Sequence, residues 1–311
     1  MQIKKYTSAD YERVARFLTD CYGENHAMTC WLPERFDDLI YRIDTLHAKE
    51  RSGKASQDYI RIFEENDEII GLILPDGDSF NSCIKRGCES IFERMLDVGE
   101  RELLPLFCST DGKIDFLVIS HDSLRYQSEA LRKRGYVREE ATDYDNVQFP
   151  MNTNYNISLP AGFRLSFGSE LDGNRKAKAC HYGFHPEDDD GVLTGAFREG
   201  ALSYQARKSS RFYPDSFECL IVTDDGDICS YCFCYVNKET STALIEPVCT
   251  RKKYRRKGLC KQMLYGVINK LKALGIDCAY INSYDWRRQV YNSAGFQTID
   301  SIGFWHKTIT L

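Results

Sequence analysis

A basic loop that opens a helix is the segment best suited to bind a charged ligand. Residues 251–257 read RKKYRRK, and after Gly258 the apolar residues recur at helical spacing as far as Gly275. The first amides of a helix lack partners within it, and the helix dipole is positive at that end. Together with the cationic side chains, these amides favour a pyrophosphate. A solvated basic loop or a nucleic-acid patch is the alternative, but the strand directly before the loop favours the phosphate site.

One carboxylate interrupts that strand. Residues 243–250 read ALIEPVCT, so Glu246 stands among apolar residues. A carboxylate in such a strand needs a partner or a chemical role, because an unpaired buried charge is costly. Glu246 is therefore a candidate functional residue, and an ion pair with a basic neighbour is the alternative.

A cysteine-rich strand could suggest a zinc site. Cys229, Cys232 and Cys234 lie in a segment that alternates as a strand, which places Cys232 and Cys234 on one face and Cys229 on the other. Zinc sites of this kind need a second pair of ligands at short spacing, and none follows. We therefore expect no metal.

Two histidines invite the same interpretation. His181 and His185 are four residues apart, as ligands on one helical face would be, but Gly183 lies between them and Pro186 follows. Both of these residues disfavour a helix. We expect instead a loop that lines a binding cleft, in which the acidic run 187–190 would attract a cationic amine. A solvated run of charges explains the same residues.

The composition describes a globular chain with room for two domains. It has 311 residues, of which 42% are apolar and 28% charged. No apolar run approaches the ~20 residues that a membrane helix needs, and charges interrupt the first residues where a signal peptide would be apolar. We therefore expect a cytoplasmic protein without a membrane partner. The 13 cysteines are expected to be mostly free thiols, and the net charge of −5 makes nucleic acid an unlikely partner.

The same order of elements occurs twice, at an offset of about 160 residues, as between Gly135 and Gly295. The repeated features are a strand before a helix, a hairpin, and a strand before a helix that ends in glycine. The pairs of segments are 3–6 and 163–167, 60–74 and 219–236, and 116–136 and 278–296. The pattern predicts a tandem α/β protein with two mixed-sheet domains and helices on both faces of each sheet.

A polar stretch between the repeats predicts the domain boundaries. Residues 148–160 read QFPMNTNYNISLP and have no periodic pattern, so we interpret them as a linker. The expected domains are then residues 1–147 and residues 161–311.

Two motifs in the second domain resemble the GNAT acyltransferases. The family's acyl-CoA loop reads Arg/Gln-x-x-Gly-x-Gly/Ala, and Arg255 to Cys260 match its first two fixed positions, with Cys260 in the third. The segment from Tyr291 to Phe296 is similar to the family's closing Tyr-x-x-x-Gly-Phe signature. Two signatures in this order, about 30 residues apart, are more specific than either alone.

The resemblance implies two tandem GNAT-like domains, of which the second uses acetyl-CoA as co-substrate. The chain would be an N-acetyltransferase that moves the acetyl group to a small-molecule or peptide amine by direct attack in a ternary complex. In this scheme Glu246 is the general base, the Val248 amide stabilises the oxyanion, and Tyr291 protonates the leaving thiolate. The cofactor would contact Val248, Cys249, Thr250, Arg255, Arg256, Lys257, Gly258, Leu259, Cys260 and Asn282.

Alternatives remain for several of these residues. Tyr291 could be a packing residue on a buried helix face, and Asn282 could cap the end of its strand. A non-catalytic acyl-CoA-binding or regulatory module is the alternative to an enzyme.

The first domain is expected to be a degenerate copy. Its counterpart of the phosphate loop reads Ile84-Lys-Arg-Gly-Cys-Glu89, in which an apolar residue replaces the leading Arg and a carboxylate replaces the small residue. Glu89 would repel a phosphate. The first domain would then serve packing or form a wall of the substrate cleft.

Overall fold

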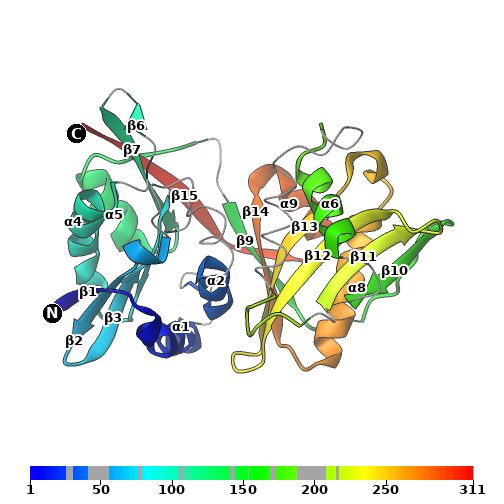
Figure 1. Ribbon diagram of the computed structural model, residues 1–311, viewed down its shortest axis with the longest axis horizontal. Helices are drawn as coiled ribbons and strands as arrows, with labels where there is room; N and C mark the ends of the chain where they lie inside the picture. Colours follow the sequence, from blue (N-terminus) through cyan, green and yellow to red (C-terminus); the bar gives the residue numbers. More distant parts are fainter. Residues whose placement is uncertain are drawn as a thin grey trace. The chain divides into compact units, whose positions relative to one another are not determined.

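The structure is a computed structural model, shown in Figure 1. It describes residues 1–25, 31–40, 56–75, 79–104, 107, 109–110, 112–140, 144–152, 154–168, 173–187, 208–214 and 217–310. The chain forms two units. The first holds residues 1–146, 283–285 and 299–311, and the second holds residues 147–282 and 286–298.

The first unit contains an antiparallel sheet in the order β1-β2-β3-β5 and a second group of strands around β7. The last strand of the chain, β15, pairs antiparallel with β7 from Ile302↔His121 to Thr310↔Lys113. The elements that begin in this unit are β1 (Gln2–Lys5), α1 (Tyr11–Asn25), α2 (Pro33–Asp38), β2 (Arg61–Glu65), β3 (Glu68–Ile73), β4 (Ser79–Phe80), β5 (Ser82–Ile84), α4 (Phe92–Glu102), β6 (Ser109–Thr110), β7 (Lys113–His121), α5 (Arg125–Lys133), β8 (Val137–Arg138) and β9 (Tyr144–Pro150). Short 3-10 helices lie at Ser8–Asp10, Ser56–Tyr59 and Glu89–Ile91.

The second unit contains strands of a mixed sheet in the order β10-β11-β12-β13-β14. Neighbours from β10 to β13 are antiparallel, and β14 is parallel to β13. Its elements are β10 (Phe163–Phe167), α6 (Gly173–Phe184), β11 (Glu218–Thr223), β12 (Ile228–Asn237), β13 (Thr242–Thr250), the 3-10 helix η8 (Lys252–Tyr254), α8 (Leu259–Ala273), β14 (Cys278–Tyr284), α9 (Asp285–Ser293) and the start of β15 (Gln297–Thr310).

Helices α6 and α8 lie on opposite faces of this sheet (Figure 1). Neighbouring residues of a strand point to opposite faces. On β13, Cys249 contacts α6 at Gly183, whereas Val248 packs against the core cluster that contains the apolar face of α8. The predicted mixed α/β fold with helices on both faces is therefore present in the second unit.

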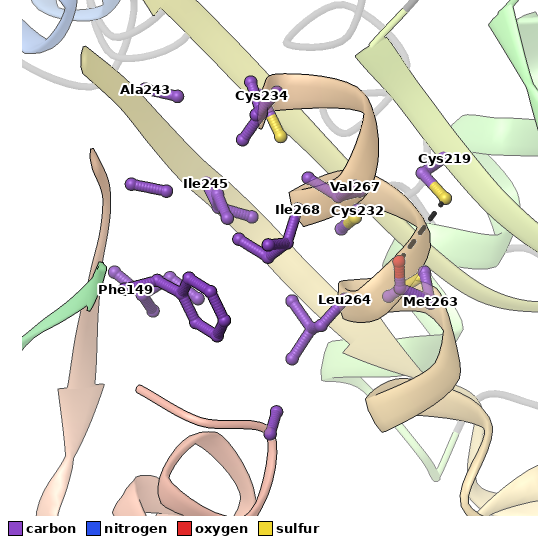
Figure 2. Packing of buried hydrophobic residues seen from close by; sticks show 14 of the residues in the cluster. Phe149, Cys219, Cys232, Cys234, Ala243, Ile245, Met263, Leu264, Val267 and Ile268 are labelled. Carbon is purple, nitrogen blue, oxygen red and sulfur yellow. Dashed lines mark hydrogen bonds between the residues drawn. The ribbon is translucent and has the colours of Figure 1, made fainter. Parts of the chain in front are cut away.

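The core of the second unit forms between the sheet and α8 (Figure 2). Cys219, Cys232 and Cys234 are fully buried there, and the Cys219 thiol donates to the Met263 carbonyl at 3.8 Å. Burial raises the pKa of the Cys219 thiol well above its usual value. Cys219 and Cys234 thus act as small apolar residues, and every cysteine in the described ranges is a free thiol.

Most of the predicted elements are confirmed. The helix expected between Gly258 and Gly275 is α8, and the two hairpins are β2–β3 and β11–β12. In the segment interpreted as a linker, residues 148–150 belong to β9, and later residues bind α8. There Tyr155 and Asn269 exchange two hydrogen bonds, of 2.8 and 2.7 Å. No helix within the described ranges is long and apolar enough to cross a membrane.

Candidate active site

Strands β13 and β14 pair over only part of their length. Their register is Thr242↔Cys278, Ala243↔Ala279 and Leu244↔Tyr280, although β13 continues to Thr250 and β14 to Tyr284. Beyond Leu244 and Tyr280 the facing edges have no ladder partner in each other. Within the described residues, main-chain groups at these edges are therefore available to a ligand that can hydrogen-bond like a strand.

The main chain of β13 alternates in a defined phase. The Arg251 amide donates to the Cys229 carbonyl at 3.0 Å, which makes these two residues a hydrogen-bonded pair of the antiparallel ladder. Because bonded and non-bonded pairs alternate, Cys249 also bonds towards β12, and Val248 and Thr250 direct their N–H and C=O groups away from it. This geometry agrees with main-chain contacts from Val248 and Thr250 to a ligand.

Cys249 was expected to contact the cofactor, but it does not face the open edge of β13. Its thiol donates to the Ala179 carbonyl of α6 at 3.9 Å, and a Cβ on Gly183 would lie 2.6 Å from its sulfur. Its peptide groups are directed to β12. Neither its side chain nor its main chain faces the open edge, so the geometry does not support Cys249 as a direct ligand contact.

Asn282 lies within β14 rather than after the end of a strand, so the capping alternative is wrong. Its Oδ1 is buried and has no hydrogen-bond partner in the part of the chain that the structure describes. A buried acceptor without a donor is destabilising, and such atoms are rare in folded proteins. The position two residues beyond the last β13–β14 pair therefore fits an amide N–H donor supplied by a ligand.

The start of α8 is open to an anion. Gly258 is the N-cap in a left-handed conformation at φ 75°, and apart from its chain neighbours no atom of the described residues lies within 4 Å of a Cβ built on it. Arg256 also has positive φ, at 66°, which costs energy for a residue with a side chain and is typical of functional loops. The first turn has neither a side-chain cap nor an acidic residue. Its amides are thus available to an anion.

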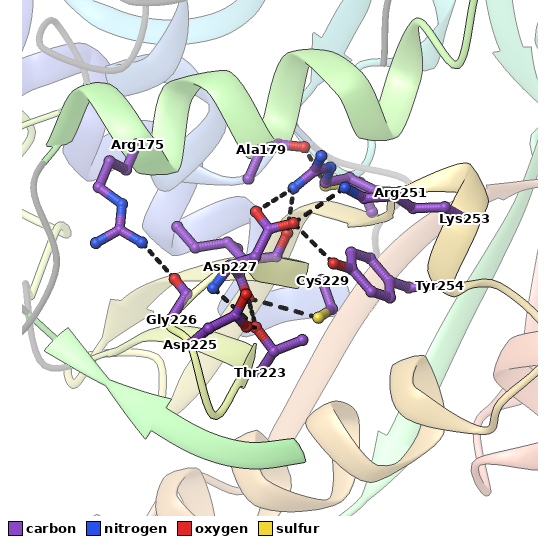
Figure 3. A network of polar contacts seen from close by, with 12 residues as sticks. Arg175, Ala179, Thr223, Asp225, Gly226, Asp227, Cys229, Arg251, Lys253 and Tyr254 are labelled. Atoms are coloured by element: carbon purple, nitrogen blue, oxygen red, sulfur yellow. Dashed lines mark hydrogen bonds and ion pairs between the residues drawn. The ribbon is translucent and has the colours of Figure 1, made fainter. Parts of the chain in front are cut away.

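The cations of the loop have different roles. Arg255 donates from Nε to the Thr250 carbonyl and from Nη2 to the Gly183 carbonyl, both at 2.9 Å, so it joins β13 to α6. Arg256 and Lys257 are exposed and remain candidates for phosphate contacts. Arg251 is buried and paired with Asp227 (Figure 3), and it therefore does not extend the phosphate-binding surface as the basic run suggested.

Leu259 and Cys260 place only main chain at the open helix end. The Leu259 side chain is part of the core. Burial raises the pKa of the Cys260 thiol to about 12, and a hydrogen bond with Thr250 opposes this in part. The thiol is therefore neutral and adds no negative charge beside a pyrophosphate.

Glu246 lies in a β-bulge. Cys232 pairs with Val248 and Cys234 with Ile245, so Glu246 and Pro247 together oppose a single residue of β12. A bulge bends the strand and redirects its side chains, and bulges are common beside active sites. The half-buried Glu246 thereby lies two residues beyond Leu244, in the part of β13 that does not pair with β14.

Tyr291 on α9 is a member of the core cluster and is 6% exposed. Its ring packs edge-on against Phe296, with centroids 6.0 Å apart. Gly295 permits the turn between them, because its φ is 103° and a Cβ there would lie 2.9 Å from the Phe149 ring. Burial, with a smaller contribution from the nearby Cys260, raises the pKa of Tyr291 well above its usual value. Within the described ranges its hydroxyl has no hydrogen-bond partner.

The histidine segment is helical, contrary to the expected loop. Helix α6 continues to Phe184, and the rings of His181 and His185 stack with centroids 4.6 Å apart. Gly183 is accommodated because it allows close contact with Cys249. Residues 188–190 of the acidic run lie outside the described residues. Among those described, no group of three or more His, Cys, Asp or Glu side chains could hold a metal ion.

In the first unit, a carboxylate occupies the corresponding loop. Glu89 accepts a hydrogen bond from the Gly87 amide at 2.9 Å, and Lys85 is paired with Glu68 at 2.8 Å. An amide and a cation that would attract an anion are thus bound within the unit.

The comparisons with known proteins identify the second unit's family. Residues 180–296 match the model of the acetyltransferase (GNAT) family, and this part of the chain is a GNAT domain. No curated protein matches the chain in sequence.

Solved structures extend the likeness to the whole chain. A GCN5-related N-acetyltransferase from Sphaerobacter thermophilus superposes with a TM-score of 0.66 at 15% identity, covering 100% of this chain and 96% of its own. A tandem GNAT protein from the clavulanic acid biosynthesis pathway gives 0.67 at 11%, covering 99% and 98%. A GNAT acetyltransferase from Colwellia psychrerythraea gives 0.61 at 10%, covering 98% and 99%. At these identities the comparison shows the fold, which is that of tandem GNAT proteins.

Proposed function

We propose that the second unit is an acetyl-CoA-dependent N-acetyltransferase. The observation that carries this proposal is the separation of β13 from β14 beyond Leu244 and Tyr280, with the unpartnered Oδ1 of Asn282 just past it. An extended arm with amide groups, such as the pantetheine of coenzyme A, satisfies both edges at once.

The binding residues follow from this placement. The Val248 carbonyl, the Thr250 amide and the Asn282 carboxamide bond the pantetheine arm. The amides at the start of α8, with Arg256 and Lys257, bind the pyrophosphate. Arg255 keeps β13 and α6 together beside that site.

The reaction needs one base, one oxyanion contact and one acid. Glu246 accepts a proton from the acceptor amine, directly or through water, and the amine nitrogen attacks the thioester carbon. The Val248 amide donates to the oxyanion that develops there. The carbon–sulfur bond then breaks, and Tyr291 gives its proton to the departing thiolate. No covalent enzyme intermediate forms, and the acceptor is a small-molecule or peptide amine.

The first unit has a supporting role in this proposal. Its loop amide at Gly87 is already bonded to Glu89, so a pyrophosphate would have to displace a carboxylate and then face its charge. We therefore assign one acyl-CoA site to each chain, with residues 1–147 as a degenerate repeat and residues 161–311 as the catalytic one.

The burial of Tyr291 favours a second candidate, a non-catalytic acyl-CoA-binding module, because a core tyrosine need not donate a proton. The experiment that separates the two measures coenzyme A binding by calorimetry and thiol release from acetyl-CoA with a panel of primary amines. Binding with amine-dependent thiol release supports the enzyme, and binding without release supports the module. Absence of binding refutes both.

A further inference from the structure

Asp227 is bound to three side chains of the basic loop (Figure 3). It lies in the turn between β11 and β12. Its carboxylate accepts from Arg251 Nη1 at 2.5 Å and from the Tyr254 hydroxyl at 2.7 Å, and Lys253 Nζ lies 3.1 Å away. A single carboxylate thus holds both ends of η8, which connects β13 to the phosphate loop.

The pairing with Arg251 is largely buried. The Arg251 side chain is only 8% exposed, and Nη1 also donates to the Ile228 carbonyl at 3.1 Å. A buried guanidinium requires a compensating carboxylate. Partial burial alone would raise the pKa of Asp227, but the bonds from Tyr254, Lys253 and Arg251 lower it to about 2. Asp227 is therefore charged whenever the protein is folded near neutral pH.

The contacts of Tyr254 reach the exposed part of the loop. Its ring lies edge-on to Phe163, with centroids 6.2 Å apart. The Lys257 ammonium lies 5.4 Å from the Phe163 ring and 5.8 Å from the Tyr254 ring, within the range of cation–π attraction. The hydrogen bond to Asp227 thus fixes one of the two rings that support Lys257.

The loop between Tyr254 and Gly258 needs such support. Arg256 has positive φ, and a residue stays in this conformation only where its surroundings impose it. The restraints on the two sides of Arg256 are Arg255, which bonds two carbonyls, and Lys257, which lies over the rings. Loss of the Asp227 bond would release the ring under Lys257.

We propose that Asp227 is a positioning residue for the acyl-CoA loop, which it holds through Arg251 and Tyr254 so that Lys257 and the first amides of α8 face the pyrophosphate. This inference rests on the proposed function. A bystander carboxylate near the site would have the opposite effect, because its charge repels phosphate. The sign of the change in affinity therefore separates positioning from simple electrostatics.

The test compares three variants. Tyr254→Phe removes one hydrogen bond and keeps the ring, the charges and the buried ion pair. Asp227→Asn removes the charge that holds the loop. Asp225→Asn is the matched control, because it lies in the same turn, changes the net charge equally, and is bonded to Thr223 instead of the loop.

We expect Tyr254→Phe to raise the dissociation constant for coenzyme A about tenfold, as loss of a hydrogen bond to a charged group does, and Asp227→Asn to raise it further. Asp225→Asn should stay within about twofold of the wild type. The KM for acetyl-CoA should rise in parallel, while kcat at saturation and the KM for the amine change little. Unchanged or tighter binding by Asp227→Asn and Tyr254→Phe would overturn the proposal.

A second readout needs no ligand. Trypsin cleaves after Lys and Arg, and residues 251–257 contain six of these. Tyr254→Phe should accelerate cleavage in this segment, with global thermal stability and the Asp225→Asn control unchanged. Wild-type protein that does not bind coenzyme A would refute the proposed function, and the role of Asp227 would then be decided by trypsin. Equal cleavage of the wild type and Tyr254→Phe would refute the positioning role of Asp227.

Discussion

Replacing Tyr291 by Phe removes the proton that the proposed reaction needs and little else. The ring packs against Phe296 in the core, and both the ring and its contacts are retained in the variant. The hydroxyl has no hydrogen-bond partner in the described part of the chain, so its loss breaks no bond of the free protein. We therefore expect the melting temperature to change by less than about 3 °C.

The expected fall in kcat follows from the acidities of the tyrosine and of the leaving thiol. A free tyrosine has a pKa of ~10 and a thiol ~8.5, so proton transfer to a thiolate in water is uphill by ~2 kcal/mol. Burial raises the pKa of Tyr291 further, but the same burial also destabilises the thiolate and makes it more basic. A positioned acid typically contributes at least about 100-fold, which is about 2.7 kcal/mol of transition-state stabilisation.

The assay is thiol release from acetyl-CoA at saturating concentration with an amine that the wild type uses. We expect kcat to fall by about 100-fold or more in Tyr291→Phe, with the dissociation constant for coenzyme A within about twofold. Because the pKa of Tyr291 is raised, the hydroxyl keeps its proton as pH increases. The wild type should therefore show no loss of kcat from Tyr291 ionisation up to about pH 10.

Equal kcat values for Tyr291→Phe and the wild type would refute this reasoning. Tyr291 would then be a packing residue, and water would protonate the thiolate. A fall in kcat that is accompanied by a large loss of thermal stability would also contradict it, since the structure gives the hydroxyl no structural bond.

Other substitutions test the site at separate points. Gly258→Glu should abolish coenzyme A binding in calorimetry, because its side chain would lie in the open space at the start of α8, whereas Gly275→Glu, also at positive φ in open space but at the other end of α8, should bind normally. Calorimetry should give one site per chain, and two equivalent sites would contradict the role assigned to Glu89. Asn282→Leu should weaken acetyl-CoA binding by about tenfold and yet maintain or raise the melting temperature, since it removes an unpartnered buried acceptor; weaker binding with lower stability would indicate a structural role. The pKa of Asp227 is lowered to about 2, so its stabilising effect should be complete above about pH 4 and lost between about pH 4 and 2, and Asp227→Asn should remove that part of the acid-unfolding transition.

Local patterns predict the elements that carry the site. The apolar spacing of Met263, Leu264, Val267 and Ile268 predicts α8, and all four side chains are buried in the core. The basic residues before Gly258 predict an open helix start, which agrees with its left-handed conformation and the lack of a side-chain cap. These features depend on residues that are close together in the sequence, and local patterns can therefore predict them.

Other features depend on contacts between distant segments. Gly183 disfavours a helix locally, but α6 continues through it because the missing side chain makes room for Cys249. The pairing of Asp227 with Arg251 had only one signal in the sequence, an acidic turn 24 residues before a basic loop. The unpartnered Asn282 carbonyl results from the separation of two strands, which no local pattern encodes.

The partner of the last strand could not be predicted either. The sequence indicates a strand after Phe296, but β15 pairs with β7 of the first unit, whose paired residues lie 181 to 197 positions earlier. The choice of partner depends on tertiary packing between distant segments, such as the burial of Trp305 in the core of the first unit.

The central claim is tested most directly by a crystal structure of the protein with coenzyme A. We expect one molecule per chain, with the pantetheine arm along Val248 to Thr250, one of its amides donating to Asn282 Oδ1, the pyrophosphate at the amides after Gly258, and the sulfur within reach of the Tyr291 hydroxyl. Coenzyme A bound elsewhere, or an Asn282 carbonyl that remains unpartnered when the ligand is present, would contradict the account.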